Sequence, residues 1–176
     1  MLIKNTRLNL SAAKFLPGSG RGISESLEWE EHGEFHRDAN GTGFVITIPG
    51  EDKLIITYTG SGDWAAPALM HVPLLTEMEV VLIDAWQIPF EAGQTSIILP
   101  RAAWSDEDMV VFLDDKAILP RASWSWAGPK IVSITAQPKS GFVEFRPKIT
   151  AFLIQKPKDR GEWSGKVNWT VGLVEK

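Results

Sequence analysis

Two histidines and a glutamate at alternate positions are the nearest approach to a metal site in this sequence. His32, Glu34 and His36 are each two residues apart, so a β-strand would place their three side chains on one face. Two imidazoles and one carboxylate form a known ligand set for divalent metals. The run is flanked by charged residues at the end of a strand, and a solvated strand face meets this pattern easily. We therefore expect no bound metal and no cofactor.

Motifs for nucleophilic or phosphate chemistry are missing or incomplete. The chain has no cysteine, which excludes thiol nucleophiles and thiolate-bound metals. No Gly-x-Ser-x-Gly elbow occurs, and the glycine-rich run 17–22 lacks the Gly-Lys-Ser/Thr ending of a phosphate-binding loop. The acidic runs 106–108 and 114–115 lack the glycine and terminal glutamate of a calcium loop and fit turn caps. We expect a protein without enzymatic activity.

An internal repeat combines the two residue types that most often carry binding energy. The octapeptide ILPRAAWS at 98–105 returns as ILPRASWS at 118–125, with seven of eight positions identical. Arginine and tryptophan are enriched at the centres of protein interfaces. The duplicated pair predicts either a contact surface or two chain corners whose tryptophans fill the ends of one core.

Tryptophan is also abundant outside the repeat, with eight residues in the chain. Each can bury roughly 150–250 Å², and one core of this size accommodates only part of them. Those in loops either cover the core or contact a partner, which would be another protein subunit or a sugar ring stacked on the indole. The expected contact residues are Trp64, Arg101, Trp104, Arg121, Trp124, Trp126 and Trp163.

The elements that must position these residues are β-strands. Apolar and polar residues alternate with a period of two in many segments, and helical periodicity is nearly absent. Short turns favour antiparallel pairing. We predict a mostly β fold, an antiparallel β-sandwich or barrel with at most one short helix near 65–75. The expected strands cover 22–35, 43–49, 53–59, 77–86, 95–99, 109–113, 130–136, 146–155 and 166–174.

The first 22 residues differ from the rest in composition. They contain a short apolar stretch followed by three glycines within residues 18–22, which suits a flexible hinge. We predict an extended N-terminal arm over 1–22 and a single β domain over 23–176. In the alternative, the apolar stretch is an edge strand folded back on its own sheet.

Charge and hydropathy exclude several classes of partner. The formal net charge over 176 residues is −4 and the basic residues are dispersed, so we expect no sequence-specific nucleic acid binding. No apolar run reaches the length of a membrane span, and the first residues lack the apolar stretch of a signal peptide. We expect a protein that is made and kept in a cytoplasm.

Several segments resemble small β-rich structural proteins of bacteriophage tails. The resemblance rests on IITYTGSGDWAAPAL at 55–69 with the strand at 77–84, and on FRPKIT at 145–150 with EWSGKVNWTVGL at 162–173. The opening LNLSAA at 8–13 is similar as well. These segments cover about half of the chain and carry no catalytic residues.

The resemblance implies a tail-tube-like fold that packs with identical subunits in a ring, such as a hexamer, around the tail axis. The expected partners are other tail tube, sheath or baseplate proteins, and the expected location is the virion, after synthesis in the host cytoplasm. The alternative function is that of a carbohydrate-binding β-sandwich involved in surface recognition.

Overall fold

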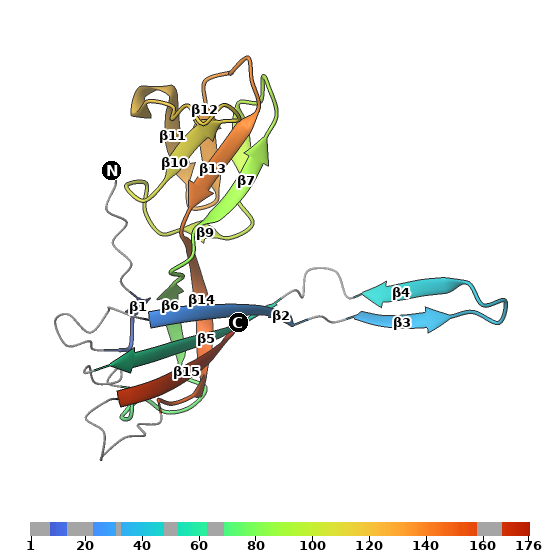
Figure 1. Cartoon of the computed structure of the whole chain (residues 1–176), viewed down its shortest axis with the longest axis vertical. Helices are drawn as coiled ribbons and strands as arrows, with labels where there is room; N and C mark the ends of the chain where they lie inside the picture. Colours follow the sequence, from blue (N-terminus) through green and yellow to red (C-terminus); the bar gives the residue numbers. More distant parts are fainter. Residues whose placement is uncertain (1–7, 14–22, 31–32, 48–52, 63–68, 158–166) are drawn as a thin grey trace.

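The computed structural model describes residues 8–13, 23–30, 33–47, 53–62, 69–157 and 167–176. This part of the chain is mostly β, and all its strand pairs are antiparallel, which confirms the predicted fold class. The described strands form sandwich-like layers and do not close into a barrel. Figure 1 shows a larger sheet, a smaller group of strands above it and a separate hairpin.

The larger sheet has the strand order β1-β6-β14-β15-β5-β2, and the short strand β9 also pairs with β14. Only β14 and β15 are neighbours both in the sheet and along the chain, so long-range pairing builds this sheet. Its strands are β1 (Asn9–Leu10), β2 (Ile23–Glu30), β5 (Lys53–Gly62), β6 (Glu77–Val81), β9 (Ala102–Ala103), β14 (Pro147–Gln155) and β15 (Val167–Glu175).

Alternation along these strands produces the first hydrophobic core. Leu54, Ile56 and Tyr58 occupy alternate positions of β5 and are fully buried, as expected for a half-buried strand. Gly60 continues that face, where it lies opposite Trp169 of β15. A Cβ atom at Gly60 would lie 2.4 Å from the indole, so glycine is required for the indole to pack here.

Residues 86–145 form a second unit with its own core, inserted between β6 and β14 of the larger sheet. Two three-stranded sheets, β10-β13-β7 and β11-β12-β8, both contribute residues to this core. The elements are β7 (Trp86–Phe90), β8 (Ser96–Ile98), β10 (Val110–Leu113), the 3₁₀ turn η1 (Arg121–Ser123), β11 (Trp124–Gly128), β12 (Ile131–Ile134) and β13 (Gly141–Phe145).

Polar side chains fasten the two units where the chain crosses between them. Glu25 of β2 accepts hydrogen bonds from the backbone N–H groups of Ile83 (2.8 Å) and Asp84 (3.0 Å). Arg146, between β13 and β14, donates from Nε to the carbonyl of Leu82 at 2.9 Å. Burial and, secondarily, the Glu25 carboxylate raise the pKa of Tyr58, so its hydroxyl stays neutral at this junction.

The hairpin of β3 (Gly33–Arg37) and β4 (Gly43–Thr47) extends away from both units (Figure 1). Its five residue pairs run from Gly33 opposite Thr47 to Arg37 opposite Gly43. Asp38 shapes the turn, because its Oδ1 accepts the N–H groups of Asn40 at 2.9 Å and Thr42 at 2.8 Å. Gly41 has a φ of 83°, which a residue with a side chain rarely adopts.

Some expected boundaries differ from the structure. The strand predicted over 77–86 is broken at 82–85, where the chain leaves the larger sheet. The predicted strands do not include β9, β11 or β13, and they reach only the first residue of β7. Of the expected helix near 65–75, residues 65–68 lie outside the described residues. Residues 69–75 form turns, and Pro73 disfavours a helix there because it lacks a backbone N–H. The described helical turn is instead η1.

The buried clusters and the placement of residues 8–13 bear on the predicted division into an arm and a domain. The sequence suggested a single β domain over 23–176, whereas the described residues contain two separate buried clusters. Of the predicted arm, residues 8–13 lie on the larger sheet, with Asn9 opposite Val81 and Leu10 opposite Val80. Leu8 and Leu10 are buried in the first core, which matches the alternative of an edge strand. The rest of the predicted arm lies outside the described residues.

Candidate functional site

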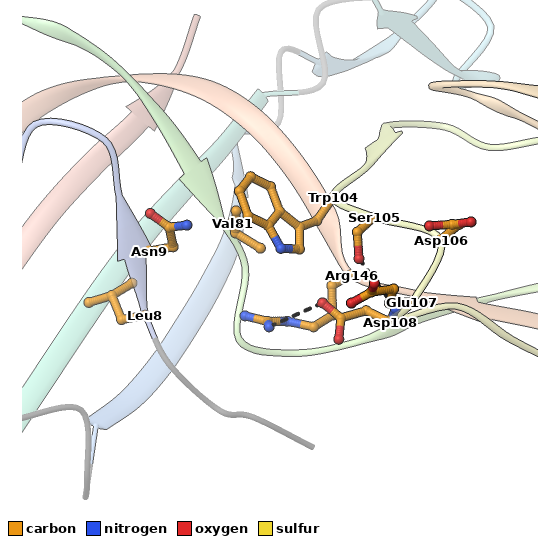
Figure 2. A pocket seen from close by; sticks show the side chains of 9 residues that line it. All are labelled: Leu8, Asn9, Val81, Trp104, Ser105, Asp106, Glu107, Asp108 and Arg146. Carbon is orange, nitrogen blue, oxygen red and sulfur yellow. Dashed lines mark hydrogen bonds and ion pairs between the residues drawn. The ribbon is translucent and has the colours of Figure 1, made fainter. Parts of the chain in front are cut away.

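A cleft of about 650 Å³ opens where the inserted unit meets the larger sheet. Figure 2 shows the segment 104–108 on one side, with Leu8, Asn9 and Val81 on the other and Arg146 at the base. We call this the junction cleft. Its lining residues are Leu8, Asn9, Val81, Trp104, Ser105, Asp106, Glu107, Asp108 and Arg146.

Backbone hydrogen bonds hold the segment 104–108 in place. Immediately before it, β9 pairs with the start of β14, and the Trp104 N–H donates to the carbonyl of Arg146 at 2.9 Å. The Asp108 N–H donates to Ser105 Oγ at 3.3 Å, a local turn that serine favours. Met109 is buried in the second core and fixes the far end. The segment is therefore held at both ends.

Two of the three carboxylates of the segment are neutralised by arginine. Arg146, whose side chain is 11% exposed, places Nη1 3.7 Å from Oδ2 of Asp108, the interaction drawn in Figure 2. Arg121 forms an ion pair with Asp106. Glu107 is exposed and has no ion pair or side-chain hydrogen bond among the described residues. It remains available as an acceptor.

Trp104 is the aromatic side chain of the junction cleft. It is 38% exposed, and the Lys148 ammonium lies 5.8 Å from its ring centroid. Lys148 is itself paired with Glu79 at 2.5 Å. The cleft thus combines an accessible indole with hydrogen-bonding groups, an arrangement that suits binding of a polar ligand with an apolar face.

The predicted contact residues fall into three groups. Arg101 and Trp104 lie at the junction of the two units. Arg121, Trp124 and Trp126 lie in the inserted unit, whereas Trp64 and Trp163 lie outside the described residues.

The two arginines of the repeat differ in their partners. The Nε atom of Arg101 lies 2.5 Å from Oε1 of Glu175, and its guanidinium lies 6.0 Å from the Trp29 ring centroid. Arg121 covers the ring of Trp124 at 3.8 Å. Trp124 is 8% exposed and belongs to the second core, against which the half-buried Trp126 also packs. Of the repeat tryptophans, Trp104 is the more accessible.

The structure describes two of the three residues of the metal hypothesis. His32 lies outside the described residues, while Glu34 and His36 belong to β3. Among the described residues, no three His, Asp or Glu side chains converge in a way that could hold a metal ion.

The acidic side of the junction cleft was interpreted from sequence only as turn caps and solvated charge. Its partner Arg146 lies far from Asp108 along the chain, so no local pattern could reveal the pair. The one available signal was the position of the acidic run directly after the first repeat copy. No pattern in the sequence marked Asn9 as a residue of a binding site.

Comparisons of the sequence with protein-family models and with curated proteins find no match. Within the described ranges, no helix has the length and apolar character needed to cross a membrane.

Proposed function

We propose that the protein is a non-enzymatic structural component of a bacteriophage tail. It associates with identical subunits in a ring, such as a hexamer, and docks onto neighbouring tube, sheath or baseplate proteins in the virion. The proposal combines the sequence resemblance with one structural observation, the β3–β4 hairpin that extends away from both units (Figure 1).

The hairpin supports association because two strands alone are at best marginally stable in water. Its sequence includes the apolar residues Phe35, Phe44, Val45 and Ile46. Contact with a neighbouring subunit would give apolar residues of this kind a surface to pack against.

A second feature that favours docking lies on the inserted unit. Ile98 of β8 and Ile131 of β12 are paired across the sheet and are 76% and 43% exposed. Cross-strand neighbours share one face, so the two side chains form a small apolar surface. Single exposed apolar residues are common, and this pair is therefore secondary support.

The experiment removes the hairpin without disturbing the larger sheet. Glu30 of β2 and Lys53 of β5 are opposite each other, so a two-residue Asn-Gly turn can replace 31–52 and connect them as a tight hairpin. Light scattering of the full chain and of this variant compares their masses. We expect the full chain to form oligomers and the variant to stay folded and monomeric.

Equal masses for the two proteins, with the same folded circular dichroism spectrum, would refute the hairpin's role in association. The tail assignment has a separate test in the neighbouring genes. Tail or baseplate genes on both sides would support it, whereas an unrelated metabolic operon would contradict it.

A further inference from the structure

The junction cleft has the size and construction of a ligand site. Its volume of about 650 Å³ falls within the roughly 300–1,000 Å³ of typical small-molecule pockets. Its walls come from chain segments that are distant in sequence and meet only where the two units join (Figure 2). The backbone contacts of 104–108 described above fix the acidic wall before any ligand arrives.

The charges at the cleft favour a neutral ligand over a cation. Asp108 is paired with Arg146, and Asp106 with Arg121. Lys148, beside the indole, is balanced by Glu79. Glu107 alone, among the described groups of the cleft wall, contributes an uncompensated charge. A cationic side chain would find Glu107 as its one partner among these carboxylates, since Asp106 and Asp108 already have their counter-ions.

The remaining groups match the surface of a sugar. A pyranose ring has an apolar C–H face, which stacks on an indole, and an edge of hydroxyl groups. Trp104 offers the partly exposed indole, and the Glu107 carboxylate accepts hydroxyl hydrogens in charge-assisted bonds. Asn9 is exposed on the opposite wall, and its amide both donates and accepts hydrogen bonds.

From these observations we propose that the junction cleft binds a neutral oligosaccharide, with Trp104 as the stacking platform and Glu107 and Asn9 as hydroxyl partners. This site is tested independently of the hairpin-mediated association, because none of the described residues that line the cleft belongs to the hairpin.

The test uses the full chain labelled with ¹⁵N. The indole Nε1–H signal of Trp104 is assigned by its loss in Trp104→Phe. Maltotriose, cellotriose and tri-N-acetylchitotriose are titrated separately to millimolar concentration, and trilysine serves as the cationic comparison. We expect at least one trisaccharide to shift the Trp104 signal saturably and trilysine to leave it unchanged.

Three variants locate the binding site. Trp104→Ala is expected to weaken binding about tenfold or more, as removal of a central aromatic anchor does. Glu107→Gln should weaken it severalfold. Trp29→Ala is the matched control, because Trp29 is 51% exposed but lies outside the cleft lining, and it should bind normally. Thermal unfolding verifies that each variant is folded.

Three outcomes would overturn the proposal. The first is no saturable shift with any of the trisaccharides. The second is a saccharide affinity that Trp104→Ala, in its folded form, leaves unchanged. The third is binding of trilysine alone with loss in Glu107→Gln, which would identify the cleft as a site for basic peptides.

Discussion

The two copies of the repeated octapeptide differ at one position yet occupy different structural environments. The first copy, 98–105, joins the inserted unit to the larger sheet. Arg101 reaches Glu175 of β15, Ala102 and Ala103 pair with β14, and Trp104 lines the junction cleft. This copy fastens the two units together.

The second copy, 118–125, stays within the inserted unit. Its Pro120 precedes the 3₁₀ turn η1, and Trp124 begins β11 opposite Ile134. The equivalent arginine, Arg121, covers the Trp124 ring at 3.8 Å instead of crossing to the other unit. The arginine and tryptophan contact residues of the larger sheet in the first copy, whereas in the second copy they pack against each other within the inserted unit.

The comparison shows that neighbouring strands decide the conformation of an octapeptide. Leu99 donates its N–H to the carbonyl of Lys130, while Leu119 donates to Val111. Local preference is a weak constraint that tertiary contacts override. The role of each repeat arginine and tryptophan therefore depends on the segment with which its copy forms backbone hydrogen bonds.

The tryptophan pair gives the largest expected difference between the copies. Trp124→Ala should lower the free energy of unfolding by about 3–5 kcal/mol, because it leaves a cavity in a packed core. Trp104→Ala should cost about 1–2 kcal/mol, since more of its indole already faces water. Urea unfolding monitored by circular dichroism measures both. Equal losses would mean that the two indoles are not buried differently.

The arginine pair should differ by a smaller amount. Arg101→Ala should cost about 2 kcal/mol, because Glu175, with a side chain only 12% exposed, loses its counter-ion. Arg121→Ala should cost about 1 kcal/mol or less, since its pair with Asp106 is exposed. Urea unfolding at low and high salt measures both. A greater salt sensitivity for the Arg101 pair would contradict this order.

Exchanging the single differing position tests the comparison directly. The double variant Ala103→Ser and Ser123→Ala gives each copy the sequence of the other. Both copies should keep their conformation, with a loss of about 1 kcal/mol because a hydroxyl enters the buried position 103. Backbone chemical shifts report the conformations. A 3₁₀ turn over 101–103 would show that the octapeptide sequence itself decides.

The smallest expected effect concerns the turn that leads into the second copy. The Lys139 hydrogen bond, followed by that from the Ala117 N–H, lowers the pKa of Asp115. The resulting stabilisation is present above the usual aspartate pKa and is lost as pH falls through the lowered value. On acidification, the melting temperature of Asp115→Asn should therefore fall by less than that of the native protein. Parallel melting curves over that pH range would measure this.

Prediction from sequence succeeded where the signal was local. The alternation around Leu54, Ile56 and Tyr58 indicated a half-buried strand, and the structure has one there. It failed at β7, where Pro89 weakens the strand pattern but is tolerated because β7 is an edge strand. It also missed the break at 82–85, because Glu25 stabilises that crossing from another strand.

The candidate site was only partly predictable for the same reason. Trp104 was predicted as a contact residue from its residue type and its place in the repeat. Its accessibility, and the burial of Trp124, depend on which unit covers each indole. The pairing of Asp108 with Arg146 requires β14 to return to the junction, which no local pattern encodes.

The amino-acid sequence alone determined a mostly β, antiparallel chain rich in tryptophan. The alternation of apolar and polar residues is local along the chain, and the composition is read directly from the sequence. The tertiary structure decided the division into two cores, the different roles of the repeat copies and the existence of the junction cleft. Each of these depends on contacts between distant segments, whose free energy is gained only when both partners are brought together.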